Sequence, residues 1–310
     1  MWSVMAKTAL SIRSFSRRST IPWTRFFIPS LMLLAVLPDS IHAASTAWTG
    51  NKNAKVRLVT GVQAIGSESR IDVGLEIQMA PGWHTYWRTS GDAGFAPIID
   101  WKNSLNLASV KIAWPAPTRL SIEGLETYVY HDHVLFPIAI ILTEPGHPLE
   151  LRASLDYAAC KEICVPYHAN LHLKLSSGVA RPSEEASLIA AAQAKVPRSL
   201  EAASIALLEL SAIAVGKEDA MLTVRLRSSG ALFRQPDLFI EGLQHGHAGP
   251  PTTKISDNGR VVELGVQVSE NTTSVLTTMP LSFTVTDGAS QAISFVATPA
   301  LVEDPNGSQR

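Results

Sequence analysis

Short segments in which apolar and polar residues alternate recur along most of the chain after residue 54, and they constrain the fold more than any other feature. A period of two places successive side chains on opposite faces of a β-strand, so one face can be buried while the other meets solvent. Turn residues such as Pro81-Gly82 and Pro145-Gly146 separate the segments. Many short strands divided by turns are typical of a β-sandwich. The segments are KVRLVTGV (55–62), RIDVGLEIQ (70–78), LFPIAIIL (135–142), LHLKL (171–175), MLTVRLR (221–227), DLFIEGL (237–243), VVELGVQV (261–268), LSFTVT (281–286) and AISFVA (292–297).

One segment departs from this pattern and predicts a helix. SLIAAAQAK (187–195) consists mostly of good helix formers and lies between Pro182 and Pro197. We expect Ser183 to cap this helix, while the two acidic residues that follow it face the positive end of the helix dipole. A single short helix in a chain of strands indicates a linker.

The aromatic residues divide the chain into two unlike parts. All seven Trp and all five Tyr lie before residue 168, as do both Cys. This asymmetry indicates two domains, with the chemistry in the first. We therefore predict an all-β protein in which a β-sandwich domain (44–178) is followed by a short helical linker (179–200), a second, smaller β-sandwich domain (201–303) and a flexible tail (304–310).

The N-terminus has the composition of an export signal. Residues 1–25 contain five basic residues and no acidic one, the apolar run FFIPSLMLLAVL (26–37) follows, and small residues stand at Ala43-Ala44. We expect a signal peptide over 1–43, cleavage near Ala43 and a periplasmic protein, with Sec and Tat export both open. An uncleaved membrane anchor is the alternative, although Pro29 interrupts a run that is short for a bilayer.

The charge balance argues against polyanionic partners. Without residues 1–43 the chain has 21 Lys and Arg against 26 Asp and Glu, a net charge of −5. A negative protein is repelled by nucleic acid and by anionic membrane surfaces. We expect neither a nucleic-acid partner nor stable membrane insertion.

The only two cysteines, Cys160 and Cys164, lie four residues apart in DYAACKEICVPYH (156–168). In an extended strand their Cα atoms would be about 13 Å apart, whereas a disulfide needs about 4.4–6.8 Å. A bridge between them therefore requires a turn or one coil of helix.

Three interpretations of this pair stay open on the residues alone. A structural staple is possible in an exported protein, but so small a ring stabilises the fold by only about 2 kcal/mol. Tight rings are easier to reduce, which favours an exchanging disulfide. Two thiolates together with His131, His133 or His168 would suit copper(I) or zinc.

Three blocks of the sequence resemble a known family. PGWHTYWRTSGDAGFAPIIDW (81–101), WPAPTRLSIEGLETYVYHDHVLFPIAI (114–140) and YAACKEICVPYHANLHLKL (157–175) resemble, in this order, the N-terminal domain of DsbD, and in closer detail its ScsB-like relatives. The resemblance covers about residues 50–176, and residues 201–310 more weakly resemble the second β domain of the ScsB-like proteins. It implies an immunoglobulin-like sandwich with a redox-active cysteine pair.

The resemblance also implies a function and its partners. Cys160 and Cys164 match the family's redox pair, with Cys164 as the exchanging sulfur and Cys160 as the resolving one, although DsbD has a wider gap between its cysteines. Such a domain receives electrons from a membrane-embedded donor, here encoded separately, and passes them to thioredoxin-like periplasmic proteins. This is the activity of a protein-disulfide reductase component, linked in the family to cytochrome c biogenesis, and it needs no cofactor.

The family has a cap loop over its cysteines, which maps to about residues 119–131. Tyr128 matches the family's cap tyrosine, while Thr127 replaces the phenylalanine before it. Leu125 or Tyr130 would then supply the shielding. The alternative for Tyr128 and Tyr130 is that they alternate on a half-buried strand.

A rival function remains. The chain could be a non-enzymatic periplasmic binding or copper-handling module whose disulfide is permanent. The reduction potential discriminates between the two functions, because structural disulfides lie below about −300 mV.

Overall fold

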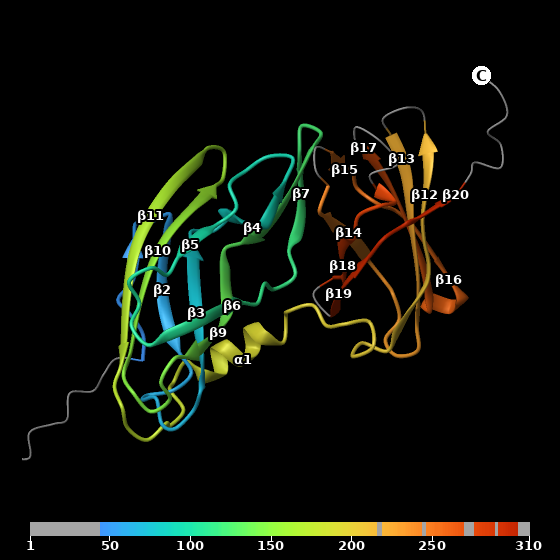
Figure 1. Cartoon of the computed structure of the whole chain (residues 1–310). Coiled ribbons are helices and arrows are strands. Elements are labelled where there is room, and N and C mark those ends of the chain that lie inside the picture. The colour runs from blue at the N-terminus through green and yellow to red at the C-terminus, as the bar shows by residue number, and fades with distance from the viewer. Residues whose placement is uncertain (1–43, 216–218, 244–245, 270–275, 289–290, 303–310) are drawn as a thin grey trace, which may run out of the picture. The chain divides into compact units, whose positions relative to one another are not determined.

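The computed structural model of the chain describes residues 44–215, 219–243, 246–269, 276–288 and 291–302 (Figure 1). The predicted signal peptide and C-terminal tail lie outside these residues. The described residues form many strands and the α-helix α1 (Ala186–Gln193), which confirms the predicted all-β, immunoglobulin-like class. No helix within these ranges has the length and apolar character needed to cross a membrane.

The first sandwich consists of two antiparallel sheets. Its strands are β1 (Thr49–Gly50), β2 (Ala54–Thr60), β3 (Arg70–Met79), β4 (His84–Gly91), β5 (Ile98–Asp100), β6 (Leu107–Ile112), β7 (Thr118–Ile122), β8 (Leu125–His131), β9 (His133–Leu142), β10 (Leu149–Cys160) and β11 (Cys164–Leu175). One sheet has the order β1-β2-β3-β9-β6. The other has the order β11-β10-β4-β8-β7, with β5 paired to β10. In Figure 1, β10 and β11 form a long hairpin.

The second sandwich is smaller and follows α1. Its strands are β12 (Ile205–Val215), β13 (Asp219–Ser228), β14 (Pro236–Glu241), β15 (His247–Ala248), β16 (Thr252–Ser256), β17 (Val261–Ser269), β18 (Leu281–Asp287), β19 (Gln291–Ala297) and β20 (Ala300–Val302). One sheet has the order β15-β17-β13-β12-β20, with β16 paired to β17, and the other is β14-β18-β19.

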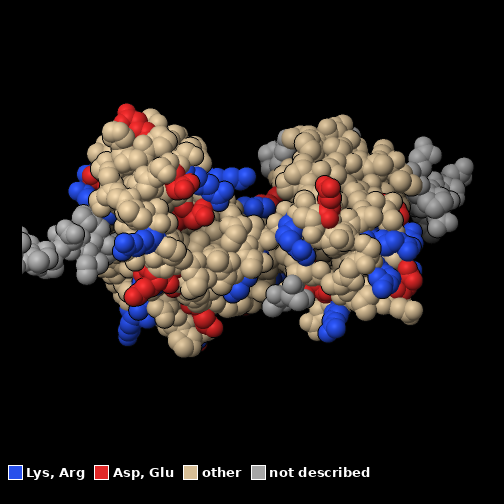
Figure 2. All heavy atoms as spheres, turned by 90° about the horizontal axis from the view of Figure 1, so that it is seen from below, with Lys and Arg blue, Asp and Glu red and all other residues tan. Residues whose placement is uncertain are grey.

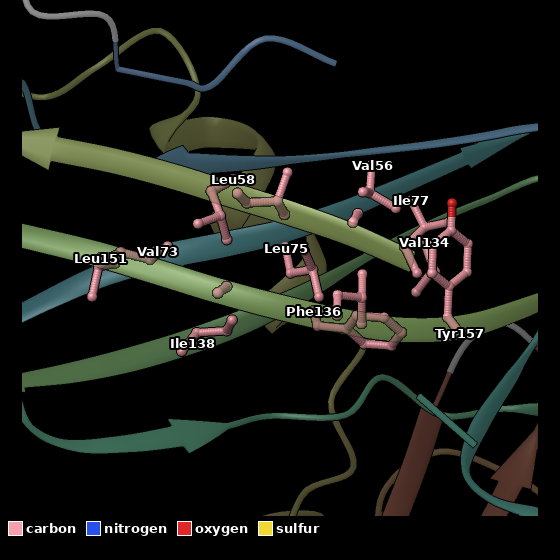
Figure 3. Packing of buried hydrophobic residues seen from close by; sticks show 14 of the residues in the cluster. Val56, Leu58, Val73, Leu75, Ile77, Val134, Phe136, Ile138, Leu151 and Tyr157 are labelled. Atoms are coloured by element: carbon pink, nitrogen blue, oxygen red, sulfur yellow. The ribbon is translucent and has the colours of Figure 1, made fainter. Parts of the chain in front are cut away.

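The core of the first sandwich follows from the alternation in its sequence. Alternate residues of β2 from Ala54 to Leu58, and of β3 from Ile71 to Met79, are buried in one cluster, so these strands present an apolar face to the opposite sheet. Trp87 is fully buried in the same cluster, and the partly buried Trp83, Trp101 and Trp114 pack against the cluster. Residues of this cluster in Figure 3 include Val56, Leu58, Val73, Leu75, Ile77, Val134, Phe136, Ile138, Leu151 and Tyr157.

The second sandwich buries its own cluster, with one exception on β14. Leu238 and Ile240 of this strand belong to the second core, whereas Phe239 between them belongs to the core of the first sandwich. Its side chain is fully buried. One strand thus contributes to two cores through its two faces.

The helix α1 lies beside β9 and buries Ile189 and Ala192 against Val59 and Leu135 (Figure 1). The prediction that Ser183 caps it is wrong. The N-cap residue is Glu185, without a side-chain capping bond, and the Ser183 hydroxyl donates instead to the Thr60 carbonyl. A tertiary partner has therefore replaced the local one.

Basic and acidic side chains are interspersed over the face shown in Figure 2. Uncharged residues form most of that face. A large patch of basic side chains would attract a polyanion. Among the described residues in this view, no large patch carries a single sign of charge.

Candidate functional site

Both cysteines lie at the tip of the β10–β11 hairpin. Cys160 ends β10, Cys164 begins β11, and the two form the last register pair of the hairpin. Their Cα atoms are 4.1 Å apart and their sulfurs form a disulfide. A three-residue turn (161–163) supplies the bend that the spacing requires.

The disulfide lies on the face of its sheet that points away from the main core. Ala159 belongs to the main core, whereas Cys160 belongs to a small separate cluster with Tyr86 and Val129. Neighbouring residues of a strand point to opposite faces, so this division follows from the pleat. Cys160 is 2% exposed, whereas Cys164 is an exposed residue. Of the two cysteines, only Cys164 is exposed to a partner.

The hydroxyl of Tyr86 contacts both sulfurs. It lies 3.2 Å from Cys160 Sγ and 3.4 Å from Cys164 Sγ. Because the bridged sulfurs carry no hydrogen, the hydroxyl is the donor. Burial raises the pKa of the Tyr86 hydroxyl, so it keeps its proton. Tyr86 can therefore donate a hydrogen bond to a sulfur that becomes a thiolate.

A loop between β4 and β5, residues 92–97, lies against Tyr86, and we call it the cover loop. Gly94 has a φ of 108°, and a Cβ built on it would overlap the ring of Tyr86. The loop is anchored at Asp92, whose amide donates to the Glu126 carbonyl and whose carboxylate accepts from the Glu126 amide, both at 2.8 Å. Glycine at 94 lets the backbone approach the tyrosine closely.

Replacing Gly94 with alanine is therefore expected to destabilise the protein and displace Tyr86. A non-glycine residue at this φ costs about 1–3 kcal/mol in strain, and the overlap with Tyr86 adds to that. Gly124→Ala is the matched control, since Gly124 also has a positive φ but nothing within 4 Å of the added Cβ. Chemical denaturation of both variants measures the difference. Equal losses of unfolding free energy would show that Gly94 does not pack on Tyr86.

His84 links the disulfide to a second histidine across the sheet. It pairs with Cys160 on β10 and with His131 on β8. Its ring centroid lies 5.6 Å from that of Tyr86 and 6.0 Å from that of His131. His84 is 5% exposed. Burial lowers the pKa of His84, and the charge of His131 lowers it further.

The lowered pKa predicts a loss of stability in acid that His84→Gln should reduce. The unfolded chain binds a proton at His84 near pH 6.5, whereas the folded chain binds it only at lower pH. Unfolding therefore takes up a proton in this window, and stability falls as the pH drops below 6.5 toward the folded pKa. Urea unfolding at pH 7.5 and pH 5.5 is the measurement.

The exposed His147 provides the control for this experiment. Its side chain is 67% exposed, so His147→Gln should keep the acid sensitivity of the parent protein. If His84→Gln also keeps it, His84 is not the group that loses its proton on folding.

The other candidate metal ligands have separate partners. His133 Nε2 lies 2.8 Å from a carboxylate oxygen of Glu76, and His168 Nδ1 lies 2.7 Å from Asp156. His131 stands two strands away from Cys160, on the far side of His84. Within the described ranges, no group of three or more His, Cys, Asp and Glu side chains is arranged to hold a metal ion.

The predicted cap residues lie on the β7–β8 hairpin. Tyr128 and Tyr130 point into the main core, on the opposite face of the sheet from the sulfurs. The Tyr128 ring packs against Trp87, and the Tyr130 hydroxyl donates to the Pro115 carbonyl at 2.7 Å. Leu125 is 48% exposed. The shielding role of these three residues stays a prediction.

Tyr86 and His84 were not among the predicted site residues. The available signal was the alternation in the block GWHTYW (82–87), which places His84 and Tyr86 on one face and the tryptophans on the other. The local pattern does not predict that β4 pairs with β10. This pairing puts the face with His84 and Tyr86 beside Cys160.

Comparisons with known proteins agree with this geometry. Residues 55–176 match the family model described as "Thiol:disulfide interchange protein DsbD, N-terminal". Residues 195–300 match a model described as a domain of unknown function (DUF8393). No curated protein matches the sequence. The crystal structure of the N-terminal periplasmic domain of ScsB from Proteus mirabilis is similar, with 26% sequence identity and a TM-score of 0.67, over 83% of this chain and 99% of that chain.

Proposed function

Because residues 55–176 belong to a DsbD N-terminal-like family of thiol–disulfide exchange domains, we propose that the chain relays electrons through the Cys160–Cys164 couple. The observation that carries the proposal is the disulfide at a hairpin tip between an exposed and a buried cysteine, with both sulfurs in contact with the Tyr86 hydroxyl. A purely structural bridge needs neither an exposed cysteine nor a hydrogen-bond donor.

In the proposed reaction the dithiol form reduces a partner's disulfide. The Cys164 thiolate attacks one partner sulfur, a mixed disulfide forms, and the other partner sulfur leaves with the electron pair and takes up a proton. The Cys160 thiolate then attacks Cys164 Sγ, the Cys160–Cys164 bond forms, and the first partner sulfur leaves as a thiolate. Two electrons have moved to the partner, and no cofactor takes part.

The difference in exposure supports this assignment of roles. Cys164 is exposed and can meet a partner's sulfur, whereas Cys160 is 2% exposed and can act only within the protein. The Tyr86 hydroxyl lies closer to Cys160 Sγ than to Cys164 Sγ. A hydrogen bond to a thiolate favours the charged form, so Tyr86 would help the buried Cys160 to react.

The same family membership supports a proposal about the partners and the compartment. We propose that a membrane-embedded reductase supplies the electrons and that thioredoxin-like periplasmic proteins receive them. Cleavage of residues 1–43 would release the protein into the periplasm. Intact mass of the exported protein tests the cleavage, and a mass that includes residues 1–43 would contradict it.

The alternative is a non-enzymatic binding or copper-handling module with a permanent disulfide. The reduction potential of the couple, measured by equilibration with glutathione or dithiothreitol buffers, separates the two functions. A value above about −300 mV supports exchange, and a lower value supports a staple. Transfer of two electrons to an oxidised thioredoxin-like protein, followed by thiol alkylation, completes the test. A protein that passes none would not be a relay.

A further inference from the structure

Three alternate residues of β14 reach from the second sandwich to the strands that carry the redox site. Asp237, Phe239 and Glu241 occupy every second position of this strand, so their side chains share one face. Phe239 packs its ring against Trp87 at 6.0 Å and Tyr128 at 4.9 Å between ring centroids. The two acidic residues on either side of it bind arginines of the first sandwich. We call these three residues the β14 face.

Glu241 holds the part of β4 that directly follows Tyr86. The register of β4 against β8 is interrupted between Tyr86 and Gly91, so the intervening residues form a bulge. Glu241 accepts two hydrogen bonds from Arg88, at 2.9 Å and 2.7 Å, and one from the Thr89 hydroxyl at 2.8 Å. The hydrogen bonds to Glu241, a residue of the second sandwich, therefore fix the position of the bulge.

Asp237 holds the cover loop through a chain of contacts. Arg119 binds the Asp237 carboxylate at 3.0 Å and the Leu238 carbonyl at 2.6 Å. The same guanidinium lies 3.3 Å from Glu126, and the backbone of Glu126 anchors Asp92 at the start of the cover loop. The Arg119 side chain is only 10% exposed, so these bonds are shielded from water.

Both routes converge on Tyr86. We propose that the β14 face is a positioning element of the redox site, which holds the Tyr86 hydroxyl against the sulfurs through the β4 bulge and the cover loop. This inference rests on the proposed function, and it assigns a task to the region that matches a domain of unknown function. Asp237, Phe239 and Glu241 touch no sulfur, so they act through Tyr86.

The step that this positioning affects is opening of the disulfide. A thiolate of dithiothreitol attacks Sγ of the exposed residue Cys164, the bond to Cys160 breaks, and its electron pair goes to Cys160 Sγ. The second sulfur of dithiothreitol then releases Cys164 and closes the oxidised ring, while Cys160 and Cys164 take up the two protons. A leaving sulfur with a lower thiol pKa leaves faster, so a hydrogen bond from Tyr86 to Cys160 accelerates the first step.

The test is a double-mutant cycle in the full chain. We measure the second-order rate constant for reduction by dithiothreitol in the parent protein, Tyr86→Phe, Asp237→Ala/Glu241→Ala, and the combination. A hydrogen bond to a charged group is worth roughly a tenfold change in rate, so Tyr86→Phe should slow reduction about tenfold. The β14 variant should slow it several-fold, and the combination should be little slower than Tyr86→Phe alone, since the two act through one contact.

Two further variants make the result specific. Asp237→Asn/Glu241→Gln keeps hydrogen-bonding side chains and should restore part of the rate, and it replaces the alanine variant if that one does not fold. Asp72→Ala removes an exposed ion pair with Arg70 and should leave the rate unchanged. Urea unfolding establishes that each variant is folded.

The outcomes separate this inference from the proposed function. The positioning role is wrong if the Tyr86 and β14 substitutions slow reduction by factors that simply multiply in the combination. It is also wrong if the β14 variant is reduced as fast as the parent protein or faster. Either result counts against it even when exchange with a thioredoxin-like protein is intact. Coupled effects with dithiothreitol support it. If they occur in a protein that exchanges with no thioredoxin-like partner, the relay fails and the positioning role stands.

Discussion

Serine in place of Cys160 is expected to turn the protein into a trap for its partner. With the resolving thiol absent, the Cys164 thiolate still attacks the partner's disulfide, but no internal thiolate can attack the mixed disulfide that results. Cys164→Ser should trap little, because the remaining Cys160 is buried beneath Tyr86. Both variants should lose essentially all turnover. Non-reducing electrophoresis after mixing each reduced variant with an oxidised thioredoxin-like protein measures the trapped complex.

The two variants are each other's control, since they differ only in which sulfur remains. Trapping through Cys160 instead of Cys164 would reverse the roles inferred from exposure and family resemblance. Trapping by neither variant would favour the permanent disulfide of the alternative function. The unmodified dithiol form should show at most a transient complex, because Cys160 resolves it.

Truncation of Phe239 is expected to give the largest loss of stability among these variants. Phe239→Ala removes a fully buried ring from the core of the first sandwich and leaves a cavity beside Trp87 and Tyr128. Such a change costs about 3–5 kcal/mol of unfolding free energy. Urea or guanidinium unfolding at pH 7.5 measures it.

The control is the same truncation at an exposed ring. Phe95 is 43% exposed, so Phe95→Ala should change the unfolding free energy by only about 0.5 kcal/mol. If Phe239→Ala were as mild as Phe95→Ala, the ring would not be packed between the two sandwiches. The proposed role of the β14 face would then lose its central contact.

Much of the fold could be predicted because its signals are local. The segment RIDVGLEIQ (70–78) predicts a strand by alternation, and β3 occupies Arg70–Met79. The helix before Pro197 was predicted for similar reasons, and α1 lies within the predicted linker. The cap of this helix was predicted wrongly, because the Ser183 hydroxyl donates its hydrogen bond to the carbonyl of Thr60, a residue distant in sequence. Local patterns describe what a segment prefers, and tertiary partners can override that preference.

The sequence by itself determined the all-β class, the position of the cysteine pair and the need for a bend between Cys160 and Cys164. These follow from side-chain period, residue type and chain geometry over a few residues. Only the tertiary structure decided which cysteine is exposed, that Tyr86 contacts both sulfurs, and that Phe239 enters the first core. Tyr86 and Cys160 are 74 residues apart in the chain, and the pairing of β4 with β10 brings them together. That register is set by the packing of whole sheets, and no short stretch of sequence records it.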